Sequence, residues 1–228
     1  MGNSQWDRIE QNVVIANTLG ELFNLWKEAH RIEEEYQNTF PKRGSKDAWK
    51  YPSDVFRSSF CYDGYMCSDK TEGSLYERTR TIVLYIFRES NAIDKSAEGE
   101  FNDSFWLSNQ LAYKRASDNK YDKRADKYLS WIRSKYPEEI RNSSWKDDSF
   151  YKNTAVMNLN KRGGYGKANP TQLKKYVNKY RVFICKEIEI ISPTIIICGG
   201  TMGHVSDILG EKKYKIYGYK HPAFWGKE

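Results

Sequence analysis

The clearest pattern along the chain is a short apolar run at residues 82–87, Ile-Val-Leu-Tyr-Ile-Phe. Four polar residues, Arg88-Glu89-Ser90-Asn91, follow it at once. A run of β-branched and aromatic residues without polar alternation is typical of a strand that is buried on both faces of a sheet. Because ligands of open α/β sheets bind outside the carboxyl ends of such strands, these four polar residues form the first candidate site.

Similar patterns predict three more strands, with helices between them. The predicted strands are 154–159, 195–198 and 214–219, and the predicted helices are 103–114, 123–136, 170–191 and 201–209. This alternation favours a parallel sheet that carries helices on both faces. We therefore predict an α/β fold, a three-layer sandwich with a central four-stranded parallel sheet. Its strand ends would bring together Glu89, Asn158, Gly199 and His221.

The first third of the chain has a different pattern. Apolar positions at helical spacing predict helix over residues 5–38, with Thr18 and Glu21 spaced as a capping box. Pro41, Gly44 and Pro52 then interrupt the pattern, and residues 40–74 are expected to be mostly irregular. We predict an N-terminal extension at 1–75 that packs on the core, and an α/β domain at 76–228.

Composition narrows the function classes. The chain has 228 residues and a net charge of +7. It has no apolar run long enough to span a membrane and no signal-peptide pattern, so we expect a cytoplasmic protein. We also expect it to be a monomer. Residues 161–186 contain eight basic residues and no acidic one, whereas a second basic region, 114–135, also carries acidic residues. Concentrated positive charge beside aromatic residues favours a nucleic-acid partner, although a solvated helix face has the same composition.

A carboxylate, a carboxamide and an imidazole are predicted to meet at the carboxyl edge of the sheet. Glu89 could act on a water molecule or stabilise a cationic transition state. Asn158 offers a donor and an acceptor that could read one edge of a base, and His221 could donate to an oxygen that gains charge. Each residue also has an ordinary structural explanation, such as a surface charge or a turn former, so the prediction depends on their joint placement.

The order of these segments over residues 80–226 resembles the uracil-DNA glycosylase superfamily. In that family the first core strand ends in a Gly-x-(Asp/Asn)-Pro motif, a later strand supplies an Asn, and a His-Pro-Ser motif follows the last strand. Here Phe87-Arg88-Glu89-Ser90-Asn91, Asn158 and His221-Pro222-Ala223 occupy these places. The resemblance implies a DNA glycosylase that flips out a uracil-like or modified base and cleaves its N-glycosidic bond.

The resemblance also implies roles for individual residues. Glu89 and His221 would be catalytic, and the base would be bound by Asn158, Phe101, Asn91, Ser90 and Arg88. DNA would be held by Lys161, Arg162, Lys167, Lys174 and Lys220, with Phe224 and Trp225 as a wedge that enters the duplex. No metal is expected, and the positions of Cys61, Cys67, Cys185 and Cys198 do not favour the iron–sulfur cluster that some branches of the family carry.

The motifs depart from the family pattern at several positions. Phe87 replaces Gly, Glu89 replaces Asp or Asn, Ser90 replaces Pro, and Ala223 replaces Ser. These departures fit a pocket reshaped for an altered base, as in base-excision repair or in defence against modified phage DNA. They also fit a non-catalytic module that binds nucleic acid or nucleotides on the same fold. A metal-dependent phosphoesterase is disfavoured, because the three histidines have no paired metal-ligand spacing.

Overall fold

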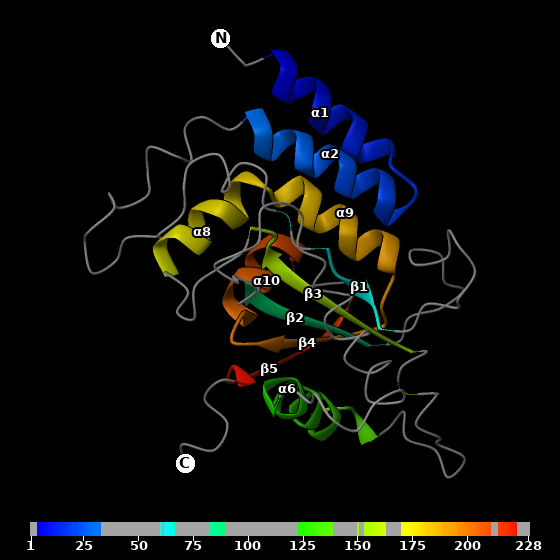
Figure 1. Ribbon diagram of the computed structural model, residues 1–228, viewed down its shortest axis with the longest axis vertical. Coiled ribbons are helices and arrows are strands. Elements are labelled where there is room, and N and C mark those ends of the chain that lie inside the picture. Colours follow the sequence, from blue (N-terminus) through cyan, green and yellow to red (C-terminus); the bar gives the residue numbers. More distant parts are fainter. Residues whose placement is uncertain are drawn as a thin grey trace.

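The computed structural model describes residues 4–32, 60, 62–66, 83–89, 123–138, 150, 153–162, 170–210 and 214–222. The strands in these ranges are β1 (Gly64–Tyr65), β2 (Val83–Glu89), β3 (Thr154–Asn160), β4 (Ile195–Gly199) and β5 (Lys215–Tyr219). The helices are α1 (Ser4–Ile15), α2 (Leu19–Ile32), α6 (Lys123–Ser134), α8 (Pro170–Lys179), α9 (Arg181–Ile191) and α10 (Met202–Leu209). The α/β class predicted from the sequence is confirmed (Figure 1).

The described strands form one five-stranded sheet in the order β1-β3-β2-β4-β5. The four strands from β2 to β5 are parallel to one another, as predicted. The prediction of a four-stranded, purely parallel sheet is wrong, because β1 adds an antiparallel edge strand next to β3. This strand lies in the segment 40–74 that was expected to be irregular, and before the predicted boundary at residue 75. Its two residues are too few to produce a recognisable pattern.

Strand β2 lies at the centre of the sheet, between β3 and β4. The chain leaves β2 to form β3 on one side, and then returns to form β4 on the other. The direction of winding therefore reverses between β2 and β4. Such a switch point opens a crevice at the carboxyl ends of the strands, which is where ligands of open α/β sheets bind. The strand taken from the sequence as the centre of the fold holds that position.

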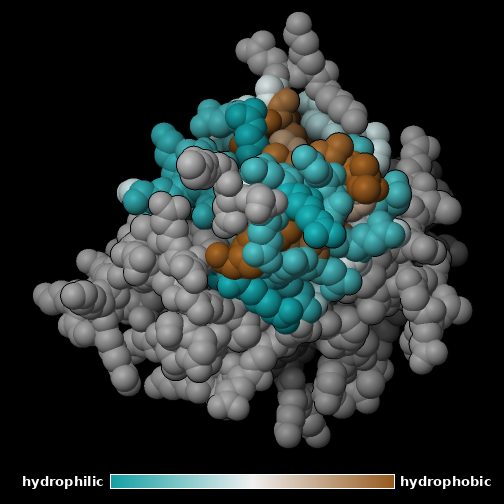
Figure 2. Space-filling model, turned by 90° about the horizontal axis from the view of Figure 1, so that it is seen from above, coloured by the Kyte–Doolittle hydropathy of each residue, from teal (hydrophilic) through white to brown (hydrophobic). Residues whose placement is uncertain are grey.

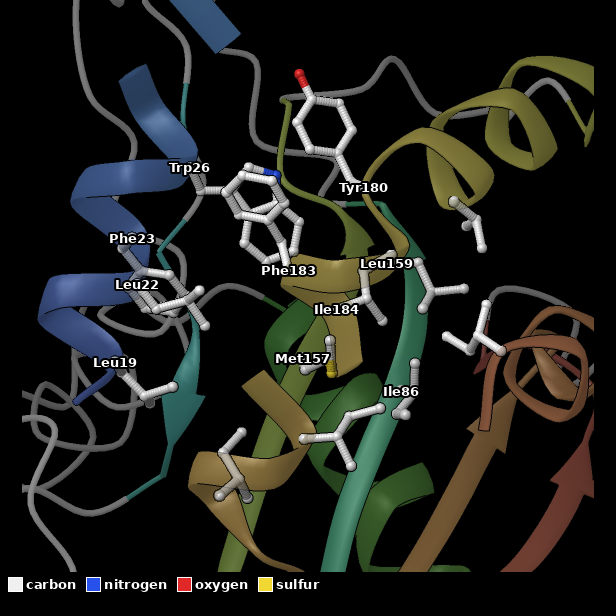
Figure 3. Close-up of a cluster of buried hydrophobic side chains, with 14 of the residues drawn as sticks. Leu19, Leu22, Phe23, Trp26, Ile86, Met157, Leu159, Tyr180, Phe183 and Ile184 are labelled. Carbon is white, nitrogen blue, oxygen red and sulfur yellow. The ribbon is translucent and has the colours of Figure 1, made fainter. Parts of the chain in front are cut away.

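Two apolar clusters cover the two faces of the sheet. One face carries α8 and α9, with α1 and α2 beyond α9, and their side chains form a continuous core with Leu84, Ile86 and the inward residues of β3. In Figure 3, Trp26 of α2 meets Phe183 of α9 within this core, with 5.2 Å between their ring centroids. The other face carries α6, whose Trp131 packs with Tyr85 and Phe87. Helices thus lie on both faces of the sheet, as the alternation of elements predicted.

The N-terminal helical segment is two helices with a defined junction. The Glu21 backbone N–H donates to Thr18 Oγ1 at 3.2 Å, and Glu21 Oε2 accepts from the Asn17 N–H at 2.8 Å and the Thr18 N–H at 3.3 Å. These reciprocal bonds are a capping box, so the pair predicted from its spacing is confirmed. The box begins α2 and separates it from α1.

The long helix predicted over residues 170–191 is interrupted. Helices α8 and α9 meet at Tyr180, whose backbone angles are φ −95° and ψ 20°. Tyr180 is fully buried and its ring stacks on Tyr176 at 4.4 Å between centroids. The break lets α8 pack on β3 while α9 contacts α1 and α2. The predicted helix at 103–114 lies outside the described residues.

The described surface seen from above is mainly hydrophilic, with separate hydrophobic patches (Figure 2). Large apolar side chains exposed in the described ranges are Val14, Ile15, Met202 and Tyr219. None of the helices in these ranges combines the length and the apolar character needed to cross a bilayer.

Candidate functional site

The site begins as a row of side chains across the carboxyl edge of the sheet. Asn158 of β3 is in register with Phe87 of β2, and parallel neighbours in register point to the same face. The next position along β4 is Gly199, and a Cβ there would lie 2.6 Å from ring atoms of Phe87. The absence of a side chain at Gly199 therefore makes room for the Phe87 ring. Asn158 and Phe87 share the face that carries α6.

His221 lies beside this row. Its ring meets that of Phe87 edge-on, at 5.9 Å between centroids and 80° between planes. Gly200, with φ at +74°, turns the chain after β4 and donates its N–H to the Tyr219 carbonyl at 2.8 Å. A Cβ at Gly200 would lie 3.2 Å from His221 Cβ and 3.3 Å from an Arg88 nitrogen. Glycine at this turn therefore allows the His221 and Arg88 side chains to approach the chain closely.

The electrostatics of the edge keep the His221 imidazole neutral. Burial lowers the pKa of His221 to about 4, and the Arg88 guanidinium contributes in the same direction. Arg88 is held by a bond from its Nε to the Gly200 carbonyl at 3.1 Å. At neutral pH the imidazole is therefore a neutral hydrogen-bonding group, and it can donate one N–H without carrying a charge.

Helix α10 begins at this edge. Thr201 is buried and its hydroxyl donates to the Ile86 carbonyl at 2.7 Å, which ties the start of α10 to β2. In the first turn, burial lowers the pKa of His204; Asp207 opposes this, and the cations Arg88 and Lys174 add to it. Sequence reasoning did not select His204. Its only sequence signal is its place four residues after the Gly199-Gly200 turn.

The backbone of β3 is held next to Asn158 by a buried carboxylate. Asp63 Oδ2 accepts the Asn158 backbone N–H at 2.6 Å. Asp63 directly precedes β1, so this bond extends the contact between β1 and β3 by one residue. Within the part of the chain that the structure describes, the Asn158 carboxamide makes no hydrogen bond. The side chain itself is mostly buried, with 9% of its surface exposed.

Asp63 also belongs to a buried ionic cluster with Lys161 and Glu187. Lys161 Nζ donates to Asp63 Oδ1 and, at 2.8 Å, to Glu187 Oε1, and all three side chains are at most 2% exposed. Burial alone would lower the pKa of Lys161, but the two carboxylates outweigh it and raise that pKa. Burial raises the pKa of Glu187 well above its usual value, against the opposing effect of Lys161. The ammonium group therefore stays charged inside the core.

This placement corrects two of the residues assigned to DNA. Lys161 and Arg162 are 0% and 1% exposed, so neither side chain is available to a phosphate. Arg162 instead donates to the His30 carbonyl at 3.3 Å, and its backbone N–H donates to Asn160 Oδ1 at 3.0 Å. The sequence pattern identified two basic residues after a strand, but it carried no information about the groups that surround them.

The other predicted site residues lie in different surroundings. Lys174 and Lys220 are exposed, Arg88 is partly exposed, and Glu89 ends β2 in register with Asn160. The residues that lie outside the described ranges are Ser90, Asn91, Phe101, Lys167, Phe224 and Trp225. The structure therefore places Asn158 and His221 each beside Phe87, and Arg88 close to His221 at the Gly200 turn.

The described residues offer no cluster of three or more His, Cys, Asp or Glu side chains that could hold a metal ion. Cys198 is buried in β4, and burial raises the pKa of its thiol to about 11. Cys185 Sγ lies 3.8 Å from the Ile208 carbonyl. Cys61 and Cys67 lie outside the described ranges, so the expectation that the chain carries no iron–sulfur cluster stays a prediction.

Comparisons of this chain with protein-family models, with curated proteins and with solved structures found no match.

Proposed function

We propose that this chain is a DNA glycosylase that excises a uracil-like or modified base from a flipped nucleotide and leaves an abasic site. The observation that carries the proposal is the placement of a neutral imidazole, His221, and of a carboxamide, Asn158, each beside Phe87 at the carboxyl edge of the sheet. The Phe87 ring lies between them, in register with Asn158 and in contact with His221. A planar base has a polar edge, to which Asn158 and His221 could form hydrogen bonds, and an apolar face, which Phe87 could contact.

The proposed reaction divides the chemistry between the two ends of the broken bond. Water adds to the anomeric carbon of the sugar, the N-glycosidic bond breaks, and the base leaves as an anion that then takes up a proton. The neutral His221 would donate a hydrogen bond to the base oxygen that gains charge. The carboxylate of Glu89, at the end of β2, would stabilise the electron-poor sugar or take a proton from the attacking water.

Asn158 and the neighbouring Phe87 ring would recognise the base. A carboxamide can donate to one atom and accept from another on the Watson–Crick edge of an extruded base. Phe87 stands where the family resemblance would place glycine, so its ring narrows the floor of the site. A base with a different outline from uracil is the substrate that this change supports.

The test is incubation of the protein with oligonucleotides that contain uracil, and with phage DNA that contains modified bases, followed by alkali treatment. Strand breaks at the position of the target base are expected with wild-type protein. Glu89→Gln and His221→Ala should each reduce the rate by about a hundredfold or more, the usual range for one transition-state hydrogen bond or one general base. Breaks that both variants produce at the wild-type rate would exclude these roles.

A second candidate is a non-catalytic module that binds a nucleotide or nucleic acid. The observation that favours it is the tight packing of the Phe87 ring against Gly199, which fills the carboxyl edge beside His221. This candidate predicts binding without strand breaks on any substrate. It also predicts that Glu89→Gln binds DNA as tightly as the wild type does.

A further inference from the structure

The strand at the outer edge of the sheet is more exposed than the strands in the core. Strand β5 is last in the sheet order, and Lys215, Gly218 and Tyr219 are exposed. Tyr219 is 38% exposed although it is a large aromatic residue. An edge strand with an exposed aromatic ring and lysines presents both stacking surface and charge to a partner.

Two rings on this edge are paired with lysines. Lys135, which follows α6, places Nζ 5.2 Å from the centre of the Tyr219 ring, and Lys215 places Nζ 5.5 Å from the centre of the Tyr217 ring. Trp131 of α6 meets Tyr219 edge-on, at 6.3 Å and 88°. Tyr219 is therefore held in a fixed orientation by α6 while more than a third of its surface stays open. We call Lys135, Lys215, Tyr217, Tyr219 and Lys220 the β5 strip.

The β5 strip is positively charged and joins the candidate site. Strand β5 contains no acidic residue, and α6 carries four basic residues and one acidic residue, Asp126. Glu138, four residues after α6, is the acidic residue described nearest in sequence to Lys135. Tyr219 accepts the Gly200 N–H, and His221 follows two residues later. The strip therefore leads from the candidate site outward along the sheet edge.

We propose that the β5 strip binds single-stranded DNA, with a base stacked on Tyr219 and phosphates held by Lys135, Lys215 and Lys220. Stacking on a side chain requires an unpaired base, because the faces of paired bases are covered by their neighbours in the duplex. The lysines match the negative charge of the sugar–phosphate backbone. The proposal rests on DNA as the partner in the proposed function, but it does not require that a base be excised.

The test is fluorescence anisotropy with a labelled oligothymidylate that contains no target base. Tyr219→Ala should weaken binding about five- to tenfold, the lower part of the range for one stacked base. Lys220→Gln should weaken it about two- to threefold and reduce the slope of log affinity against log salt by about 0.7. Tyr219→Phe should bind as the wild type does, because it keeps the ring.

The matched control is Arg8→Gln, since Arg8 is exposed on α1, a helix on the opposite side of the sheet from α6. It removes one positive charge, as Lys220→Gln does, and should change affinity less than twofold. If Tyr219→Ala is poorly folded by circular dichroism, Tyr219→Leu removes the ring and keeps most of the volume. Wild-type affinity in both Tyr219→Leu and Lys220→Gln would overturn the proposal, and so would tighter binding of duplex than of single-stranded DNA.

This experiment separates the β5 strip from the proposed function. Weaker oligothymidylate binding in Tyr219→Ala and Tyr219→Leu, with no strand breaks on any substrate, would support the strip and refute the glycosylase. Strand breaks together with wild-type binding in Tyr219→Ala and Tyr219→Leu would support the glycosylase and refute the strip.

Discussion

Lys161 and Lys220 each follow directly after a parallel strand at the same edge of the sheet, yet their surroundings are opposite. Lys161, after β3, is 0% exposed and lies between the carboxylates of Asp63 and Glu187. Lys220, after β5, is exposed. One lysine therefore lies in a buried ionic cluster at the end of a strand, and the other carries its charge at the surface. The difference shows that position after a strand does not determine the role of a charge; the elements packed around it do.

The largest effect is expected from removing the buried charge. Lys161→Met leaves two carboxylates in the core without their cation, which typically costs about 3–5 kcal/mol of unfolding free energy. Lys220→Met removes the same charge from the surface and should change stability by about 0.5 kcal/mol or less. Urea denaturation of both variants measures the difference. Equal stabilities for the two would show that Lys161 is not a buried ion-pair partner.

The burial of Lys161 also shows where sequence reasoning stops. The basic residues at 161–162 were visible as charge after a strand, and an exposed phosphate site was the natural interpretation. The burial depends on Asp63 and Glu187, which lie 98 and 26 residues away. A single sequence offers no periodicity that connects residues so far apart.

Other features depend on local pattern, and these were predicted well. Strands β2 to β5, helix α6 and the capping box of Thr18 and Glu21 follow from apolar runs and short spacings. Because parallel strands share one carboxyl edge, the placement of Asn158 and His221 at that edge also followed from the predicted parallel strands. The edge strand β1 did not, because two residues carry no pattern.

The packing of the candidate site can be tested against a nearby position that lacks it. Gly199→Ala places a Cβ 2.6 Å from the Phe87 ring, whereas a Cβ at Gly203 in α10 meets nothing within 4 Å. Overpacking of this kind costs about 1–3 kcal/mol. Gly203→Ala should instead stabilise the protein by about 0.5–1 kcal/mol, because alanine favours a helix. Thermal and urea denaturation of both variants measure the two effects.

A double-mutant cycle identifies Phe87 as the cause of the first effect. In a Phe87→Ala background the cost of Gly199→Ala should fall to about 0.5 kcal/mol or less, because the opposing ring is absent. An unchanged cost would mean that Gly199 is constrained by its backbone and not by Phe87. In that case the tight contact would no longer favour the non-catalytic alternative.

A pH-dependent effect is expected from protonation of His221, which is only partly buried, unlike Lys161. Its pKa of about 4 in the folded protein is below its ordinary value of 6.5, so between these values the unfolded chain binds a proton that the folded protein does not. Stability should therefore fall as pH decreases through this range. His221→Gln removes this contribution but keeps that of His204. Thermal midpoints at about pH 7 and about pH 4.5 should accordingly differ less in the variant than in the wild type. An equal difference in both proteins would show that the imidazole is not held neutral at the sheet edge, and its role as an uncharged donor would then lose its support.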